Sequence, residues 1–165
     1  MKIVRVFIVS SIDGFYLPLD LQRFYGFDDL DYQNLYRDAD IILTNSGRYA
    51  KLKHNELNRK KQMYRVTKDM SLHPYDKKKP HELTVIDQIK EVKKGNVLVI
   101  GNDNNLNSYL FSKNWVDEII VCQFPVTLGK GRRSFPVFDD KRSWDIKGRQ
   151  LFKEGLTMIF YGCDM

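Results

Sequence analysis

The chain has 165 residues, 42% of them hydrophobic and 13% aromatic, which fits one ordinary domain with a buried core and argues against a second. No stretch approaches the roughly 18 uninterrupted apolar residues of a membrane-spanning helix, and the first apolar run contains Arg5, so we expect a cytoplasmic protein without a signal peptide. The net charge of +6 at pH 7 excludes neither nucleic acid nor a phosphorylated small molecule as the partner.

The apolar pattern of the first 100 residues predicts alternating strands and helices. Residues 2–11 are dense in Val, Ile and Phe, as in a central strand buried on both faces, and a turn signal follows at Asp13-Gly14. Residues 15–27 are aromatic and irregular. The next predicted elements are a helix over residues 30–38, a strand over 39–43, a short strand over 64–67, an amphipathic helix over 83–94 closed by Gly95, and a strand over 96–100.

The remaining third of the chain continues this alternation and then changes. A turn over residues 101–105 leads into a helix over 106–113 and a strand over 116–124, and such strand, turn and helix units favour a parallel sheet. A loop over residues 125–131 follows. The last two predicted strands, residues 144–151 and 156–162, can pair antiparallel.

Neither a disulfide nor a metal site is predicted. Cys122 and Cys163 have apolar or aromatic neighbours, which is typical of buried thiols in a reducing compartment. The histidines at positions 54, 73 and 81 lie among lysines and share no ligand spacing with either cysteine.

Much of the positive charge lies in residues 51–79, which include Lys60, Lys61, Lys68 and the lysines 77–79. Clustered lysines can neutralise nucleic-acid phosphates, but aromatic residues that could stack on bases are not interleaved with them in a regular way. A solvated basic face, or a patch that attracts a phosphorylated small molecule, is therefore the favoured interpretation, and nucleic-acid binding is the weaker alternative.

Several motifs occur in an order that resembles one known family. The first two are Ser11-Ile12-Asp13-Gly14 after the first strand and residues 39–47, a strand that ends in a glycine-containing loop. The later ones are Ile100-Gly101-Asn102 before a helix, Val116-Asp117-Glu118 at the start of a strand, Pro125, Leu128-Gly129-Lys130-Gly131, and Phe135 or Phe138. Together they resemble the reductase domain of riboflavin biosynthesis, a branch of the dihydrofolate reductase-like family, over nearly the whole chain.

The resemblance implies a fold, a cofactor and an assembly. The fold is α/β and dihydrofolate reductase-like: a mostly parallel central sheet is flanked by helices and followed by antiparallel C-terminal strands. The family binds NADPH across the carboxyl ends of the strands, reduces a small heterocycle such as a phosphoribosylaminouracil or a pterin, and is often homodimeric. We therefore expect residues 1–165 to form a single domain that is an NADPH-dependent reductase.

Two loops are candidates for contacts with the cofactor phosphates. The turn Gly101-Asn102-Asp103, which opens the helix at Leu106, could offer backbone N–H groups to a pyrophosphate, although Asp103, Asn104 or Asn105 could instead simply cap this helix. The pair Thr67-Lys68 resembles the hydroxyl and cation with which the fold clasps a 2′-phosphate, although Lys68 could equally be one more solvated lysine.

A third loop and one carboxylate complete the candidate site. The run Asn45-Ser46-Gly47-Arg48 could wrap the adenosine half, with the planar cation of Arg48 on a phosphate or on adenine. Asp13 is the best candidate for a catalytic carboxylate near the reaction centre, although an Asp before Gly more often only forms the turn. The aromatic residues that could wall a substrate pocket, or belong to the core, are Phe15, Tyr16, Tyr25 and Phe27.

The chain also departs from the pattern of the family it resembles. Ile100 stands where the family carries a strand carboxylate, Asn102 replaces its second glycine, and the acidic Asp103 follows. Residues 53–55 read Lys-His-Asn where the riboflavin enzymes carry Asp-Asp-Pro. These changes leave open an alternative function: a non-catalytic, nucleotide-binding or structural dimer of the same fold.

The strand over residues 116–124 carries the expectation of a homodimer. It has apolar side chains on both faces, and the loop after it is rich in Gly, Lys and Arg and can cover little apolar surface. We therefore expect a second copy to pack on this part of the sheet. The alternative is that helices of the same chain cover it completely.

Overall fold

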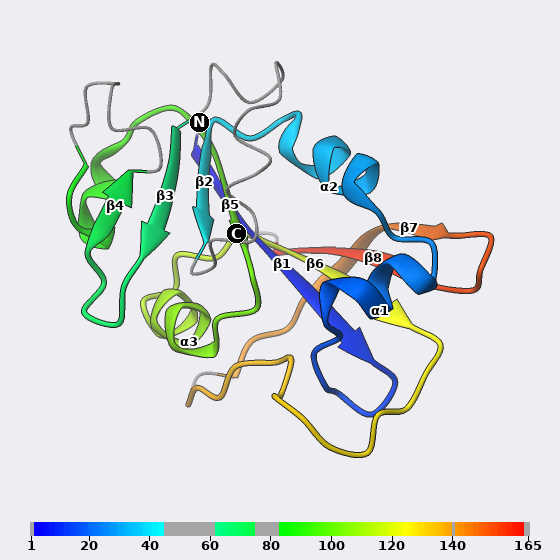
Figure 1. Cartoon of the computed structure of the whole chain (residues 1–165). Coiled ribbons are helices and arrows are strands. Elements are labelled where there is room, and N and C mark those ends of the chain that lie inside the picture. Colours follow the sequence, from blue (N-terminus) through cyan, green and yellow to red (C-terminus); the bar gives the residue numbers. More distant parts are fainter. Residues whose placement is uncertain (1, 45–61, 75–82, 140, 164–165) are drawn as a thin grey trace.

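The computed structural model describes residues 2–44, 62–74, 83–139 and 141–163. Within these residues one eight-stranded sheet forms, in the order β4-β3-β2-β5-β1-β6-β8-β7 (Figure 1). The strands are β1 (Lys2–Ser11), β2 (Ile41–Thr44), β3 (Gln62–Val66), β4 (Leu72–Pro74), β5 (Gly95–Ile100), β6 (Glu118–Phe124), β7 (Asp145–Leu151) and β8 (Thr157–Gly162). The helices are α1 (Leu19–Phe24), α2 (Asp29–Tyr36), α3 (Asn104–Ser112) and a 3₁₀ helix, η3 (Ile86–Glu91).

The first strand is the centre of the sheet, as its continuous apolar sequence predicts. β1 pairs in parallel with β5 on one side and with β6 on the other. β2 and β3 extend the parallel half, whereas β4, β8 and β7 pair antiparallel with their neighbours. The predicted dihydrofolate reductase-like architecture, with antiparallel C-terminal strands, is confirmed.

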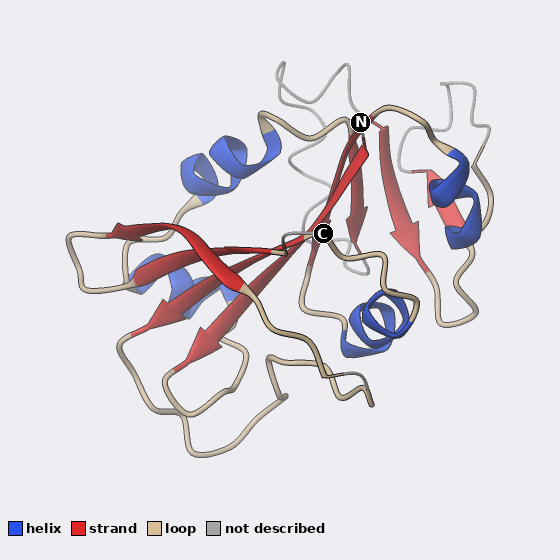
Figure 2. Cartoon of the chain, turned by 180° about the vertical axis from the view of Figure 1, so that it is seen from behind, coloured by secondary structure: helices blue, strands red, loops and turns tan. Residues whose placement is uncertain are grey.

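The two faces of the sheet carry separate cores, because successive side chains of β1 point to opposite sides. Phe7 and Val9 belong to the core under α2, whereas Val6 and Ile8 belong to the core under α3. Figure 2 shows the same sheet from behind, with its helices lying on either side. Cys122 lies buried in the first core as a free thiol, and this burial raises its pKa.

The stretch over residues 15–27 was predicted to be irregular, and this was wrong, because it contains α1. The pattern hides this helix because Gln22 is fully buried. Its amide donates to the carbonyl of Leu17 (2.7 Å) and accepts from the hydroxyl of Tyr32 (2.5 Å), so a polar residue occupies a core position.

The amphipathic helix predicted over residues 83–94 is too long, because only Ile86–Glu91 is helical. The residues before η3 are extended, and the carbonyl of Thr84 accepts from the N–H of Leu72 (2.7 Å). Only the six residues of η3 coil, as a 3₁₀ helix whose buried Ile86 and Ile89 are three positions apart. No helix among the described residues is long and apolar enough to cross a membrane.

Candidate functional site

The candidate site lies at the edge of the sheet where the parallel strands end. Because β1, β2, β3, β5 and β6 run in the same direction, their last residues, Ser11, Thr44, Val66, Ile100 and Phe124, lie along one edge. Figure 1 shows the arrowheads of β1, β2 and β3 directed to the lower side of the molecule. The predicted contacts Asn45, Ser46, Gly47 and Arg48, and residues 53–55, lie outside the described residues.

The turn between β5 and α3 places Asp103 as the cap of the helix. The Asp103 carboxylate accepts from the N–H groups of Asn105 (3.0 Å) and Leu106 (3.4 Å). Two of the amides that could face a pyrophosphate are thus engaged by a carboxylate of the chain itself. The side chain of Leu106 is fully buried in the core under α3.

Asn102 lies in the same turn with left-handed backbone geometry (φ +51°), and Gly101 before it has φ +101°. The Asn102 side chain is only 2% exposed. Its Oδ1 accepts from the N–H of Val9 (2.9 Å), and its Nδ2 donates to the carbonyls of Val9 (3.3 Å) and Ser134 (3.0 Å). The second glycine of the family pattern is therefore replaced by a buried carboxamide that ties β1 to a later loop.

A strap formed by residues 132–134 lies over this edge. The guanidinium of Arg132 is 3.4 Å from the carbonyl oxygen of Gly101 and 4.4 Å from the centre of the Tyr16 ring. The Asn104 amide donates to a carbonyl of the strap (2.7 Å). Arg132 was missed at the sequence level, and its only signal is its position directly after Leu128-Gly129-Lys130-Gly131.

Some buried polar atoms around this strap have no hydrogen-bond partner in the described part of the chain. They are Oδ1 of Asn104, Oδ1 of Asn107 and Oγ of Ser134. Two belong to α3 and one to the strap, so they flank the region where the strap meets the helix. An unpaired buried oxygen is costly, and a bound polar group or water would relieve that cost.

Asp13 is a structural clamp in this structure. Its carboxylate accepts from the hydroxyl of Ser11 (2.6 Å) and from the N–H groups of Leu128 (3.0 Å) and Gly129 (2.7 Å). These hydrogen bonds, led by the one from Ser11, lower the pKa of Asp13 to about 2. The carboxylate therefore joins two of the motifs noted in the sequence, and as a group ionised at neutral pH it is poorly suited to donate a proton.

The turn between β3 and β4 carries Thr67 and Lys68. The Thr67 hydroxyl donates to the Asp69 carboxylate, which also accepts from the N–H of Ser71 (3.3 Å). These contacts, led by the one from Thr67, lower the pKa of Asp69. Lys68 is exposed, so it is the cation that this turn presents to solvent.

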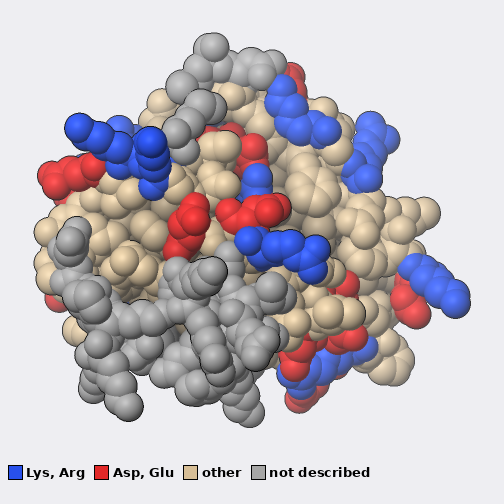
Figure 3. Space-filling view, turned by 90° about the horizontal axis from the view of Figure 1, so that it is seen from above, with Lys and Arg blue, Asp and Glu red and all other residues tan. Residues whose placement is uncertain are grey.

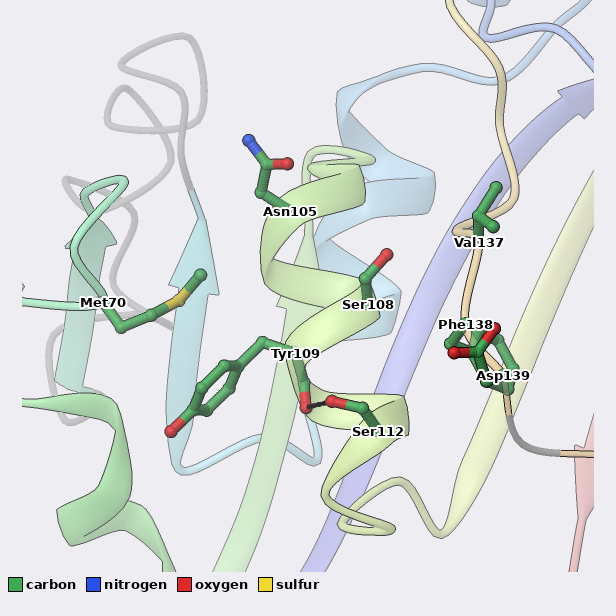
Figure 4. Close-up of a pocket in the computed structure, with 8 residues that line it drawn as sticks. All are labelled: Met70, Asn105, Ser108, Tyr109, Ser112, Val137, Phe138 and Asp139. Atoms are coloured by element: carbon green, nitrogen blue, oxygen red, sulfur yellow. Dashed lines mark hydrogen bonds between the residues drawn. The ribbon is translucent and has the colours of Figure 1, made fainter.

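An open hollow of about 630 Å³ runs along the outer side of α3, beside this turn (Figure 4). Its lining residues are Met70, Asn105, Ser108, Tyr109, Ser112, Val137, Phe138 and Asp139. Figure 4 shows Asn105 near the start of α3 and Ser108 further along it, with Met70 and Val137 on opposite sides of the helix. The amide of Asn105, the hydroxyls of the two serines and the carboxylate of Asp139 lie in this hollow together with apolar side chains. Such a mixture of polar and apolar groups fits the adenosine half of a dinucleotide.

The aromatic residues predicted as pocket walls divide into two groups. Phe27 is buried core, stacked on Phe7 with 5.8 Å between ring centres, and Tyr25 packs against the same core. Tyr16 reaches the edge of the sheet and contacts Arg132. Ile100, in place of the family's carboxylate, is buried in the core under α2.

Comparisons with known proteins agree with this fold. The family model described as the RibD C-terminal domain matches residues 26–158. A protein assigned to riboflavin biosynthesis from Shewanella sp. PV-4 has a similar structure, with a TM-score of 0.69, 16% identity, and coverage of 97% of this chain and 98% of that one. No curated protein sequence matches the chain.

Two further solved structures are similar. The first is a pyrimidine reductase-like protein from Corynebacterium diphtheriae, with a TM-score of 0.69, 12% identity, and coverage of 97% of this chain and 91% of that one. The second is RibD from Acinetobacter baumannii, with a TM-score of 0.57, 14% identity, and coverage of 98% of this chain and 58% of that one. At these identities the likeness concerns the fold.

Proposed function

The chain belongs to the RibD C-terminal domain family, and from that premise we propose that it is a reductase that transfers a hydride from NADPH to a small heterocycle of the pyrimidine or pterin kind. The observation that carries the proposal is the carboxyl edge of the sheet. At this edge Gly101 follows β5 and Lys68 follows β3, and the hollow along α3 is lined by Met70 from the turn that carries Lys68. We further propose a cytoplasmic location for this activity.

The cofactor half of the site would be formed by the turn after β3 and by α3. Lys68 would face the 2′-phosphate, and the amide and hydroxyl groups of Asn105 and Ser108 would hold the adenosine. Gly101 has no side chain to block the approach of a pyrophosphate to the backbone. A reduced nicotinamide supplies the hydride when it is bound.

The substrate half would be formed by Arg132 and Tyr16. Arg132 offers a planar cation to carbonyl oxygens or to a phosphate, and its contact with the Tyr16 ring fixes its orientation. Because Ile100 offers no carboxylate, the proposed substrate is one whose recognition does not depend on that group. The strap would help to keep water from the reacting atoms.

One observation favours a second candidate function, a non-catalytic dimer of the same fold. The carboxylate of Asp103 already holds the amides of Asn105 and Leu106, and a negative charge at this place opposes a pyrophosphate. In that case the fold would bind nucleotides weakly or not at all. Nucleic-acid binding stays the weaker alternative predicted from the sequence: on the face shown in Figure 3, Lys and Arg are interspersed with Asp and Glu among the described residues, and Lys60, Lys61 and the lysines 77–79 lie outside the described residues.

The direct test is a titration with NADPH and with NADH, followed by the fluorescence of the nicotinamide. We expect Lys68→Ala to weaken NADPH binding by about tenfold or more and to leave NADH nearly unchanged, because only NADPH presents a 2′-phosphate. Lys153→Ala, which removes an exposed lysine from the hairpin of β7 and β8, is the control. If the nicotinamide fluorescence shows no saturable change with the wild type at millimolar NADPH, the reductase proposal fails and the non-catalytic dimer becomes the favoured function.

A further inference from the structure

The carboxamide of Asn102 replaces a missing strand partner at the carboxyl edge. The pairing of β1 with β5 extends only to Val6 and Val99, and three residues further along β1 the peptide groups of Val9 bond to Asn102 instead. Oδ1 accepts from the N–H of Val9, and Nδ2 donates to its C=O. A primary carboxamide thus pairs with the Val9 residue in both directions.

Nicotinamide carries the same chemical group. Its ring substituent is a primary carboxamide, with one acceptor oxygen and an NH₂ donor, as in the side chain of Asn. Val9 lies near the carboxyl end of β1, and the Asn102 amide that bonds to it also donates to Ser134 of the strap. A cofactor that places its nicotinamide at this edge therefore presents a group that can replace the Asn102 amide bond for bond.

We propose that Asn102 is an internal competitor at the backbone N–H and C=O of Val9 (the carboxamide position), so that a nicotinamide binds there only when the Asn102 side chain leaves. This inference rests on the proposed function. Asn102 is then a residue that sets the affinity for nicotinamide nucleotides. Because the same amide also donates to the carbonyl of Ser134, its displacement releases one contact of the strap.

We expect Asn102→Gly to change the binding only of nucleotides that carry the nicotinamide ring. Glycine accepts the left-handed backbone of this position without strain, and the change removes only the competing amide. The wild type must first break the two hydrogen bonds of the Asn102 side chain to Val9 and the one to Ser134, so we expect NADPH to bind the variant about tenfold or more tightly. A nucleotide without the nicotinamide ring, 2′-phospho-ADP-ribose, should bind both proteins equally.

Asn114→Gly is the matched control. Asn114 has the same left-handed backbone (φ +59°) and also takes part in a side-chain hydrogen bond, with Arg142 (2.8 Å), but it lies beyond the other end of α3. We expect it to bind both nucleotides as the wild type does. Equal changes for NADPH and for the ringless nucleotide in Asn102→Gly, or no change for either, would overturn the inference.

A second measurement separates this inference from the proposed function. Free nicotinamide at millimolar concentration should shift the backbone amide resonance of Val9 in Asn102→Gly, whereas nicotinic acid, which lacks the NH₂ donor, should not. If no variant binds NADPH but nicotinamide shifts Val9, the reductase proposal fails and the carboxamide position stands. If nicotinamide leaves Val9 unchanged, the carboxamide position is refuted.

Asn102→Gly leaves the backbone N–H and C=O of Val9 without their partner, which could destabilise the fold. Thermal unfolding shows whether the variant is folded. Should it not fold, the wild type gives the answer. The NH₂ resonances of the Asn102 side chain should then move when NADPH saturates the protein and stay in place with 2′-phospho-ADP-ribose. Equal effects of both nucleotides on these resonances would overturn the inference.

Discussion

Asp13 shows how an exposed carboxylate can act entirely within the fold. It holds the N–H groups of Leu128 and Gly129, which lie more than a hundred positions away in the chain. The hydrogen bonds lower its pKa to about 2, so its contribution to stability is complete above about pH 4 and is lost as the pH falls toward 2. This clamp fixes the loop from which the strap continues.

An NMR titration tests this assignment. We expect the Asp13 carboxyl carbon to titrate with a midpoint near 2, and the amide resonances of Leu128 and Gly129 to move with the same midpoint. In Asp13→Asn, which keeps one acceptor but loses the charge, the pH-dependent movement of both amides should disappear. A midpoint near 4, the ordinary value for Asp, would mean that the clamp is absent in solution.

At the scale of elements, the start of α3 is both a structural cap and a candidate phosphate site. We predict that Asp103→Ala lowers the free energy of unfolding by about 1 kcal/mol, because the N–H groups of Asn105 and Leu106 lose their acceptor. Asp103→Ser keeps an acceptor and should cost only a few tenths of a kcal/mol. Denaturant unfolding measures both, and equal losses would show that the carboxylate acts through its charge rather than as a cap.

The sequence predicts the elements of this fold well where one local rule decides them. The strand over residues 2–11 coincides with β1 because a run so dense in Val, Ile and Phe is typical of a strand buried on both faces. α1 escaped prediction because Gln22 is buried through hydrogen bonds to Leu17 and Tyr32, and such tertiary contacts have no local pattern. The extended residues before η3 likewise depend on pairing with β4.

The site was less predictable than the fold. Asp103 caps α3 and Asp13 holds a loop, so the contacts of both residues in the structure agree with the structural alternatives rather than with roles in cofactor binding or catalysis. The cofactor roles of Lys68 and Gly101 stay predictions. Neither the pairing of Asn102 with Val9 nor the contact of Arg132 with Tyr16 could be foreseen, because both join segments that only the folded chain brings together.

At the scale of the whole molecule, one face of the late sheet is incompletely covered. Val121 and Ile159 are direct partners in β6 and β8, lie on the same face, and are both partly exposed. Ile146 of β7, on the same face, is 49% exposed. We therefore propose a homodimer that packs through this face.

Sedimentation velocity at micromolar concentration tests the dimer. We expect a mass twice the 19.5 kDa of one chain for the wild type, and a monomer for Ile159→Lys, because a buried unpaired cation opposes the interface. Phe24→Lys changes an exposed apolar residue of α1 and should remain dimeric. A wild type that sediments as a monomer at every concentration would exclude this assembly.

The central place of β1 has a consequence for how the protein is made. β1 is translated well before its partners β5 and β6, which begin only at Gly95 and Glu118. Until Phe124 has emerged, β1 has no complete pairing, and its apolar side chains depend on chaperones or on transient contacts to avoid aggregation. The central strands of the sheet therefore pair late, across long stretches of sequence. We expect nascent chains that are halted before β6 to be cleaved by proteases along their whole length.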